Sequence, residues 1–194
     1  RHSGLAIGGL AAVSTMAGSR VREAQAAAPT AGARIDIKKS VCTHCSVGCT
    51  VIAADASLER MADLRQTSGV SLLAQDGRRP ALAAEAFDLV VVDAPCSSTG
   101  VLARRPEARL RYDRKHLDEL TALQRGLLRS ASRLVHQQGR LLYATCSLSP
   151  RENQAIAHTL DGWRVLAEQV IWPDQWQAGG YAVALVRSGD TLER

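Results

Sequence analysis

Two cysteines of this 194-residue chain stand apart from the other three, each among small polar residues. Cys96 lies in the run Asp93-Ala-Pro-Cys96-Ser-Ser-Thr-Gly100, and Cys146 lies between Thr145 and Ser147. A thiolate is a strong nucleophile, and the positive end of a helix dipole favours its formation. Small cysteines are also common in protein cores. The residue types therefore leave two interpretations open: a pair of reactive thiols, or two buried structural residues.

Three acidic residues stand at or near the ends of predicted strands. They are Asp55, Asp76 and Asp93. Open α/β sheets place their binding sites at the carboxyl ends of strands, so we expect these acids and the two isolated cysteines to share one edge of a sheet. One carboxylate would suit ribose hydroxyls and another the amino group of a base. Taken singly, each aspartate is at least as well explained as a capping residue.

The elements that would position these residues alternate along the chain. Strands are predicted over residues 50–55, 70–76, 87–95, 139–147 and 181–187, and helices over residues 56–69, 116–135 and 149–161. The 87–95 run is continuously apolar, as expected of a strand covered on both faces. The 149–161 segment opens with a serine, a proline and the acid Glu152, the signature of a capped helix N-terminus. The order predicts an α/β fold, the C-terminal part of a doubly wound sheet.

A third group of residues with chemical potential is the closely spaced set Cys42, Cys45 and Cys49. Three thiolates on one turn-rich segment suit an iron–sulfur cluster or zinc. A [4Fe–4S] cluster normally takes a fourth thiolate, and the next cysteine along the chain is Cys96. The odd total of five cysteines in this distribution is unlike a disulfide framework.

Residues 1–30 are expected to lie outside the folded domain. Their apolar, Gly- and Ala-rich run followed by a small-residue segment is typical of an export signal, and a flexible tail is the alternative. No segment approaches the ~20 apolar residues that span a bilayer, so we expect no membrane association through a helix.

The net charge of +5 gives little support to nucleic-acid binding by itself. Residues 1–53 contain six basic and two acidic residues, which leaves the larger part of the chain close to neutral. One local cluster, with Arg104, Arg105 and Arg109, follows the Cys96 loop. These guanidinium groups could bind RNA phosphates, or they could form a solvated basic face.

Residues 54–187 strongly resemble the RNA 5-methylcytosine methyltransferases of the NOP/Sun group, above all the bacterial enzymes that act on 16S ribosomal RNA. The motifs that carry the resemblance are Asp93-Ala-Pro-Cys96-Ser-Ser-Thr-Gly100, Arg104-Arg105-Pro106, Gln124, and Tyr143-Ala-Thr-Cys146-Ser147 with Glu152-Asn153. The resemblance implies a Rossmann-like sheet that binds S-adenosylmethionine. It also implies a cytoplasmic enzyme that methylates C5 of cytosine in RNA.

The same resemblance assigns roles to single residues. Cys146 would be the nucleophile that adds to C6 of the base, and Cys96 would help to remove the C5 proton or to release the enzyme. Asp93 would hydrogen-bond the base and stabilise the charge shifted onto its ring, and it would also be one of the cofactor-binding residues. Asp55 would bind the ribose of S-adenosylmethionine, and Asp76 would contact its adenine edge.

Residues 1–53 resemble a different family, the molybdenum-dependent formate dehydrogenases, at the start of their catalytic subunit. The run KKSVCTHCSVGCTVIA (residues 38–53) carries this resemblance, which implies a [4Fe–4S] cluster. This cysteine-rich segment stands where the methyltransferase resemblance implies a Gly-rich cofactor loop, so we expect impaired cofactor binding. The sequence therefore predicts three parts: an export-signal-like or disordered segment (1–30), a cysteine-rich segment (31–53) and a partial methyltransferase domain (54–194). The alternatives are an iron–sulfur fragment of a formate dehydrogenase and an inactive chimeric remnant.

Overall fold

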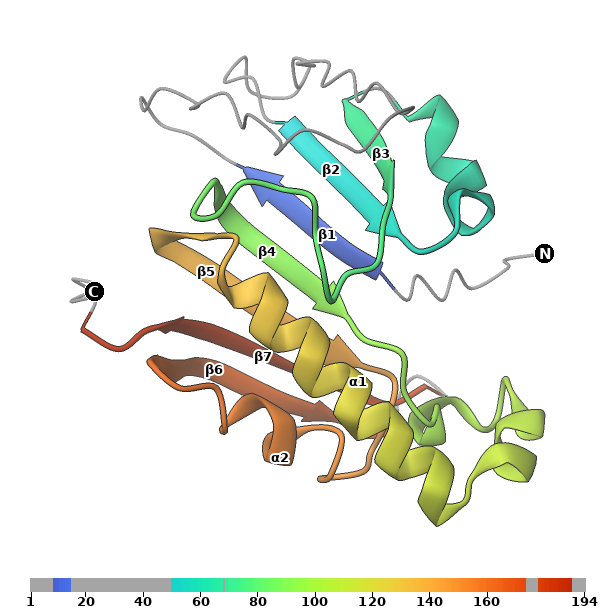
Figure 1. The fold of residues 1–194 in the computed structure, drawn as a ribbon. Coiled ribbons are helices and arrows are strands. Elements are labelled where there is room, and N and C mark those ends of the chain that lie inside the picture. Colours follow the sequence, from blue (N-terminus) through green and yellow to red (C-terminus); the bar gives the residue numbers. More distant parts are fainter. Residues whose placement is uncertain (1–8, 15–49, 68, 174–177, 190–194) are drawn as a thin grey trace.

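The computed structural model describes residues 9–14, 50–67, 69–173 and 178–189. These residues form one seven-stranded sheet with strand order β3-β2-β1-β4-β5-β7-β6 (Figure 1). The strands are β1 (Gly9–Ser14), β2 (Thr50–Asp55), β3 (Val70–Ala74), β4 (Phe87–Asp93), β5 (Val135–Thr145), β6 (Trp163–Ile171) and β7 (Gly180–Arg187). The helices are the 3-10 segments η1 (Leu58–Gln66), η2 (Thr99–Val101) and η3 (Pro106–Arg111), and the α-helices α1 (Arg114–Ser132) and α2 (Gln154–Ala157).

The strand directions make this a mixed sheet. β2 runs parallel to β3 and β4 runs parallel to β5, whereas β7 is antiparallel to both β5 and β6. The β3-to-β5 part has the strand order of a doubly wound α/β sheet. The predicted α/β class is therefore confirmed.

Strand β1 departs from the doubly wound pattern because it runs antiparallel to both of its neighbours, β2 and β4. Its first residue, Gly9, pairs with Asp55 and Asp93, while Ser14 lies opposite Thr50. The N-terminal end of β1 therefore lies beside the carboxyl ends of β2 and β4.

The hydrophobic core lies between the sheet and helix α1, which crosses β4 and β5 (Figure 1). The buried face of α1 includes Leu128 and Ala131, which pack with Val90, Leu141 and Tyr143 of the strands. Burial of a leucine such as Leu128 contributes about 2 kcal/mol, so the amphipathic stripe of this helix fixes its position on the sheet. At its N-terminus the Asp113 side chain accepts a hydrogen bond from the backbone N–H of His116, at 2.7 Å.

Several predicted elements differ from the observed ones. The predicted helix over 56–69 is a 3-10 helix in which Met61 is fully buried. The predicted helix over 149–161 is reduced to the four residues of α2, because residues 149–153 form hydrogen-bonded turns instead. Strand β6 is not among the predicted elements: its sequence, WRVLAEQVI, is rich in apolar residues but lacks the strict apolar and polar alternation of a half-buried strand, and most of its side chains are exposed. β1 falls within the segment predicted to lie outside the fold, whose other residues are outside the described ranges.

The carboxyl ends of β4 and β5 are joined closely. The backbone N–H of Gly100, in the loop after β4, donates to the carbonyl of Cys146 at 2.9 Å, and its own carbonyl accepts from Gly179 at 2.6 Å. A Cβ atom on Gly100 would lie 2.3 Å from the Gly179 carbonyl oxygen and 2.9 Å from that of Cys146. Glycine is therefore required where these three segments meet.

Within the described ranges, no helix is long and apolar enough to cross a membrane.

Candidate active site

The two isolated cysteines meet at the carboxyl edge of the sheet. Cys96 follows β4 and Cys146 follows β5, which are adjacent parallel strands, and the two Sγ atoms lie 3.2 Å apart. Ser98 brings its hydroxyl to 3.6 Å from the Cys146 Sγ. To do so Ser98 adopts a left-handed backbone conformation (φ 60°), which costs a non-glycine residue about 1 kcal/mol.

The two thiols differ strongly in pKa. The pKa of Cys146 is lowered to about 6, above all by the hydrogen bond from Cys96 and with smaller contributions from the Ser98 hydroxyl and the positive charge of Arg105, while burial acts in the opposite direction. The same hydrogen bond, together with burial, raises the pKa of Cys96 far above its ordinary value. At neutral pH the pair therefore consists of a Cys146 thiolate and a Cys96 thiol that donates to it.

Asp93 ends β4 on the same edge. Burial raises its pKa to about 6, and the negative charge of Cys146 adds to the effect. A carboxyl group with this pKa is protonated in an appreciable fraction of molecules near neutral pH, so it can act as a hydrogen-bond donor or acid as well as an acceptor.

A buried polar network underlies the thiols. Glu152 and Gln124 are fully buried, and Gln124 Nε2 donates to the Pro95 carbonyl at 2.8 Å and to Glu152 at 3.1 Å. Asn153 accepts from the Thr145 hydroxyl at 2.7 Å and donates to the Ser147 carbonyl at 2.9 Å. The sequence does not indicate this network: its pattern predicts Glu152 as an acid in the first turn of a helix, whereas the Glu152 side chain is fully buried.

A small pocket of about 80 Å³ opens beside Cys96. Its walls are formed by Cys96, Ser97, Ser98, Arg105, Glu107, Ala108, Arg111, Tyr112 and His116. Of the three arginines predicted to bind RNA, Arg105 lines this pocket, whereas Arg104 and Arg109 are exposed and do not. The structure therefore brings one of the three next to the thiols.

A larger cavity of about 520 Å³ lies between the ends of β2 and β3 and helix α1. Asp55 lines it together with apolar side chains, among them Val92, Leu123 and Leu127. The Asp55 side chain is buried; its Oδ1 accepts from the backbone N–H of Ser57 at 2.8 Å. Its Oδ2 has no hydrogen-bond partner among the described residues. A buried carboxylate oxygen without a partner is costly, which indicates a place for a ligand donor.

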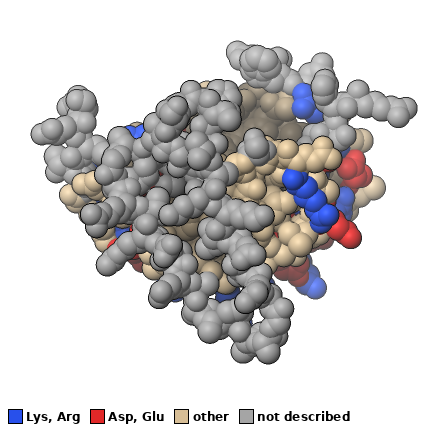
Figure 2. Space-filling view, turned by 90° about the horizontal axis from the view of Figure 1, so that it is seen from above, with Lys and Arg blue, Asp and Glu red and all other residues tan. Residues whose placement is uncertain are grey.

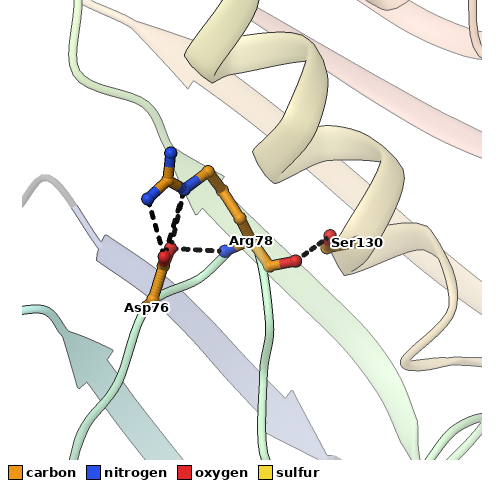
Figure 3. Close-up of polar contacts among 3 residues, drawn as sticks. All are labelled: Asp76, Arg78 and Ser130. Atoms are coloured by element: carbon orange, nitrogen blue, oxygen red, sulfur yellow. Dashed lines mark hydrogen bonds and ion pairs between the residues drawn. The ribbon is translucent and has the colours of Figure 1, made fainter.

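Asp76 lines the same cavity but is already engaged. Its carboxylate forms a bidentate pair with Arg78, with Nη2–Oδ2 2.8 Å and Nε–Oδ1 3.0 Å, and accepts the Arg78 backbone N–H at 2.9 Å. This hydrogen bonding lowers the pKa of Asp76 to about 2. The Ser130 hydroxyl donates to the Arg78 carbonyl at 2.7 Å, which ties this loop to helix α1 (Figure 3). Of the three predicted cofactor residues, Asp55 and Asp76 thus line this cavity, while Asp93 is not among its walls.

The predicted metal ligands Cys42, Cys45 and Cys49 lie outside the described residues. Within the described ranges no group of three or more His, Cys, Asp and Glu residues could hold a metal ion. The proposed cluster at these three cysteines stays a prediction.

Figure 2 shows one face of the molecule, in which described basic and acidic side chains adjoin on the right side and no continuous patch of Lys and Arg is visible among the described residues. This agrees with the near-neutral charge of the larger part of the sequence.

Comparison with known proteins places this geometry in a family. The family model described as 16S rRNA methyltransferase RsmB/F matches residues 40–178, which is more than half of the chain. The chain belongs to the RsmB/F family. The match begins inside the cysteine-rich segment, before the boundary at residue 54 predicted from the sequence.

Individual relatives agree with the family model. The chain is 36% identical over 124 residues to ribosomal RNA small subunit methyltransferase F of Aeromonas salmonicida, covering 53% of this chain and 26% of that protein. It is 50% identical over 68 residues to ribosomal RNA small subunit methyltransferase B of Xanthomonas campestris pv. campestris, covering 35% and 16%. Among solved structures, that of PH0851 has a TM-score of 0.65 and 30% identity, and covers 70% of this chain and 36% of that one.

The matches cover only a part of each curated relative. The chain spans about a quarter or less of the length of these curated relatives. The resemblance to methyltransferases of this family is thus confirmed, and both the B and the F enzymes are among the relatives. The same matches give no support to the resemblance of residues 1–53 to formate dehydrogenase.

Proposed function

We propose that this chain of the RsmB/F family carries out the covalent step of cytosine-C5 methylation in RNA, with 16S ribosomal RNA as substrate and S-adenosylmethionine as methyl donor. The observation that carries the proposal is the thiol pair: a Cys146 thiolate and a Cys96 thiol 3.2 Å apart, at the edge that also holds Asp93. Such a pair offers a nucleophile and a proton-transfer group on the same side of a bound base.

The large cavity suits the nucleoside part of S-adenosylmethionine. The buried Oδ2 of Asp55 would accept the hydrogen bond of a ribose hydroxyl, and Leu123 and Leu127 would pack against the adenine. Asp76, held by Arg78, keeps a partly exposed carboxylate at the cavity wall for the adenine amino group. These residues fit the nucleoside. For the methionine part, the family resemblance implies a Gly-rich loop before Asp55, and the sequence has the cysteine-rich segment there instead, so binding of the whole cofactor is expected to be impaired. When bound, the cofactor supplies an electrophilic methyl group for C5 of the base.

The first chemical step on the base is addition of the Cys146 thiolate to C6. As the S–C6 bond forms, the electrons of the C5–C6 double bond move onto C5 and into the ring toward N3. Asp93 in its protonated form would donate its proton to N3 and so stabilise this charge. C5 thereby becomes nucleophilic enough to take the methyl group.

The last step is removal of the C5 proton with expulsion of Cys146. Once Cys146 is bonded to carbon, it carries no negative charge and no longer requires the hydrogen bond from Cys96. Since that hydrogen bond is the largest cause of the raised pKa of Cys96, the pKa of Cys96 falls when the adduct forms. The Cys96 thiol can then lose its proton to solvent and accept the C5 proton. N3 returns its proton to the Asp93 carboxylate, the C5–C6 double bond re-forms, and the Cys146 thiolate leaves.

RNA would approach over the Cys96 loop. Arg105 and Arg111 line the small pocket beside the thiols and present positive charge for phosphate oxygens, with Tyr112 beside them. Arg104 and Arg109 extend this charge on the exposed surface.

A methyl-transfer assay tests the proposal. The full chain is incubated with 16S ribosomal RNA and S-adenosylmethionine labelled in the methyl group, and 5-methylcytosine is quantified after nuclease digestion. Cys146→Ala should abolish incorporation, whereas Glu119→Gln, an exposed change on helix α1, should leave it unchanged. Undiminished activity of the Cys146→Ala variant would exclude Cys146 as the nucleophile.

A further inference from the structure

Glu152 joins the loops that carry the two cysteines. It is fully buried, and it lies in the turn between Cys146 and helix α2. Its carboxylate contacts Ser97 and Ser147, the residues that directly follow Cys96 and Cys146. A single side chain therefore binds both loops one residue away from the reactive sulfur atoms.

The carboxylate of Glu152 is fully used as an acceptor. Oε1 accepts the backbone N–H of Ser97 at 2.8 Å and the amide of Gln124 at 3.1 Å. Oε2 accepts the hydroxyls of Ser97 and Ser147, both at 2.5 Å. Hydrogen bonds to an ionised group are about twice as strong as those between neutral groups, so the four together hold the loops firmly.

The surrounding hydrogen bonds fix the Ser147 hydroxyl as a donor to Glu152. Its proton is donated to Glu152, and its oxygen accepts from Thr99 Oγ1 and from the backbone N–H of Ser149, each at 3.0 Å. Thr99 is the donor in this contact because the Ser147 proton is already used and Thr99 Oγ1 itself accepts from Leu148 N–H. The Ser97 oxygen also lies 3.2 Å from the Ser147 oxygen, with the protons of both hydroxyls directed to Glu152. The Ser147 hydroxyl therefore has no free acceptor position.

Glu152 is itself held by residues of strand β5 and helix α1. The Tyr143 hydroxyl, from strand β5, donates to the Glu152 backbone carbonyl at 2.6 Å. Gln124, from helix α1, bridges the carboxylate and the carbonyl of Pro95, the residue before Cys96. Strand β5 and helix α1 thus hold Glu152 in place, and the two cysteine loops are bound to its carboxylate.

We infer that Glu152 is a positioning residue that sets the separation of the Cys96 and Cys146 sulfur atoms by hydrogen-bonding the serine after each. The inference rests on the proposed function for its catalytic meaning, because a proton can be shared between the thiols only at short separation. Its physical content, the link between Glu152 and the spacing of the thiols, does not depend on methyl transfer.

The test replaces Glu152 by glutamine. The glutamine amide nitrogen would take the place of Oε2, which accepts the Ser97 and Ser147 hydroxyls in the wild type. An acceptor thereby becomes a donor, so at least one of these two hydrogen bonds is lost while the side chain keeps its size. Glu119→Gln, the same change on an exposed face of α1, is the matched control. A second pair of variants, Ser97→Ala and Ser147→Ala, removes one link at a time and leaves the carboxylate in place.

The measurement is the rate at which the full chain forms a Cys96–Cys146 disulfide with diamide, which takes up the two hydrogens that the thiols lose. Peptide mass spectrometry distinguishes this bond from any that involves the other cysteines. In Glu152→Gln the rate should fall roughly tenfold, the size expected for one lost hydrogen bond to a charged group. The pH midpoint for alkylation of Cys146 should rise as well, and Glu119→Gln should match the wild type in both readouts.

A folded Glu152→Gln variant with the wild-type rate and alkylation midpoint would overturn the inference. If that variant does not fold, Ser97→Ala and Ser147→Ala decide it by the same readouts, and wild-type values in both would overturn it. Neither readout uses RNA or cofactor. Absence of methyl transfer together with slowed disulfide formation would therefore refute the proposed function and leave the positioning role of Glu152 intact.

Discussion

The Sγ atoms of Cys96 and Cys146 lie 3.2 Å apart although 50 residues separate them in the chain. The pair forms because β4 and β5 are adjacent and parallel, so that the loops after both strands leave at the same edge. The short separation allows one thiol to stabilise the other as a thiolate. The first two predictions follow from this asymmetry.

Cys146 should react with iodoacetamide at a much lower pH than Cys96. The pKa of Cys146 is lowered to about 6, so its thiolate forms as the pH rises through 6, whereas the raised pKa of Cys96 keeps that thiol protonated up to pH 9 and beyond. Peptide mass spectrometry after short exposures at a series of pH values measures both midpoints. Equal midpoints for the two cysteines would contradict the assignment of nucleophile and donor.

Replacement of Cys96 should raise the pKa of Cys146, because the hydrogen bond from Cys96 is the largest cause of its low value. Cys96→Ala removes this donor, whereas Cys96→Ser retains a hydroxyl in its place. We expect the alkylation midpoint of Cys146 to increase in the order wild type, Cys96→Ser, Cys96→Ala. An unchanged midpoint in Cys96→Ala would mean that Ser98 and Arg105 alone are sufficient.

Asp55→Asn should weaken binding of S-adenosylmethionine by roughly tenfold or more, as expected when a hydrogen bond to a charged group is lost. The stability of the free chain should stay the same or increase, because the buried Oδ2 of Asp55 has no partner among the described residues. Calorimetric titration and thermal unfolding measure the two effects. Asp63→Asn, on the exposed surface, is the control. Unchanged affinity in Asp55→Asn would remove Asp55 from the cofactor site.

Gly100→Ala should destabilise the chain by about 1–3 kcal/mol, because the added Cβ meets the carbonyl oxygens of Gly179 and Cys146. The same displacement should raise the alkylation midpoint of Cys146. Gly126→Ala is a matched control of opposite sign: its Cβ has only an ordinary contact with Arg78 at 3.6 Å. In helix α1 that change should stabilise by up to about 1 kcal/mol. Urea unfolding of both variants measures the difference, and equal stabilities would contradict the close joining of the loops.

Much of the sheet could be predicted from the sequence because strands β4 and β5 and helix α1 carry strong apolar patterns. Their order places the residues after β4 and β5 at one edge, which is how the meeting of Cys96 and Cys146 could be expected. Strand β6 could not be predicted, since an edge strand with mostly exposed side chains lacks the apolar alternation of a half-buried strand.

The polar groups beneath the site were beyond sequence reasoning for a different reason. Glu152 follows a serine and a proline, which is also the pattern of a helix cap, and only the three-dimensional structure shows its side chain between two loops. The pairing of Asp76 with Arg78 was missed likewise, because an aspartate at a strand end is equally suited to a ligand or to its own loop. Local patterns indicate where a side chain starts, whereas its partner depends on the packing of distant segments.

The measurement that tests the central claim most directly is covalent capture of the base. The full chain is incubated with S-adenosylmethionine and a 16S ribosomal RNA fragment that contains 5-fluorocytidine, in which the fluorine at C5 prevents the elimination that would release the enzyme. Peptide mass spectrometry then locates the bound nucleotide. We predict an adduct on Cys146 that is absent from the Cys146→Ala variant. An adduct on Cys96, or no adduct on the wild-type chain, would contradict the account.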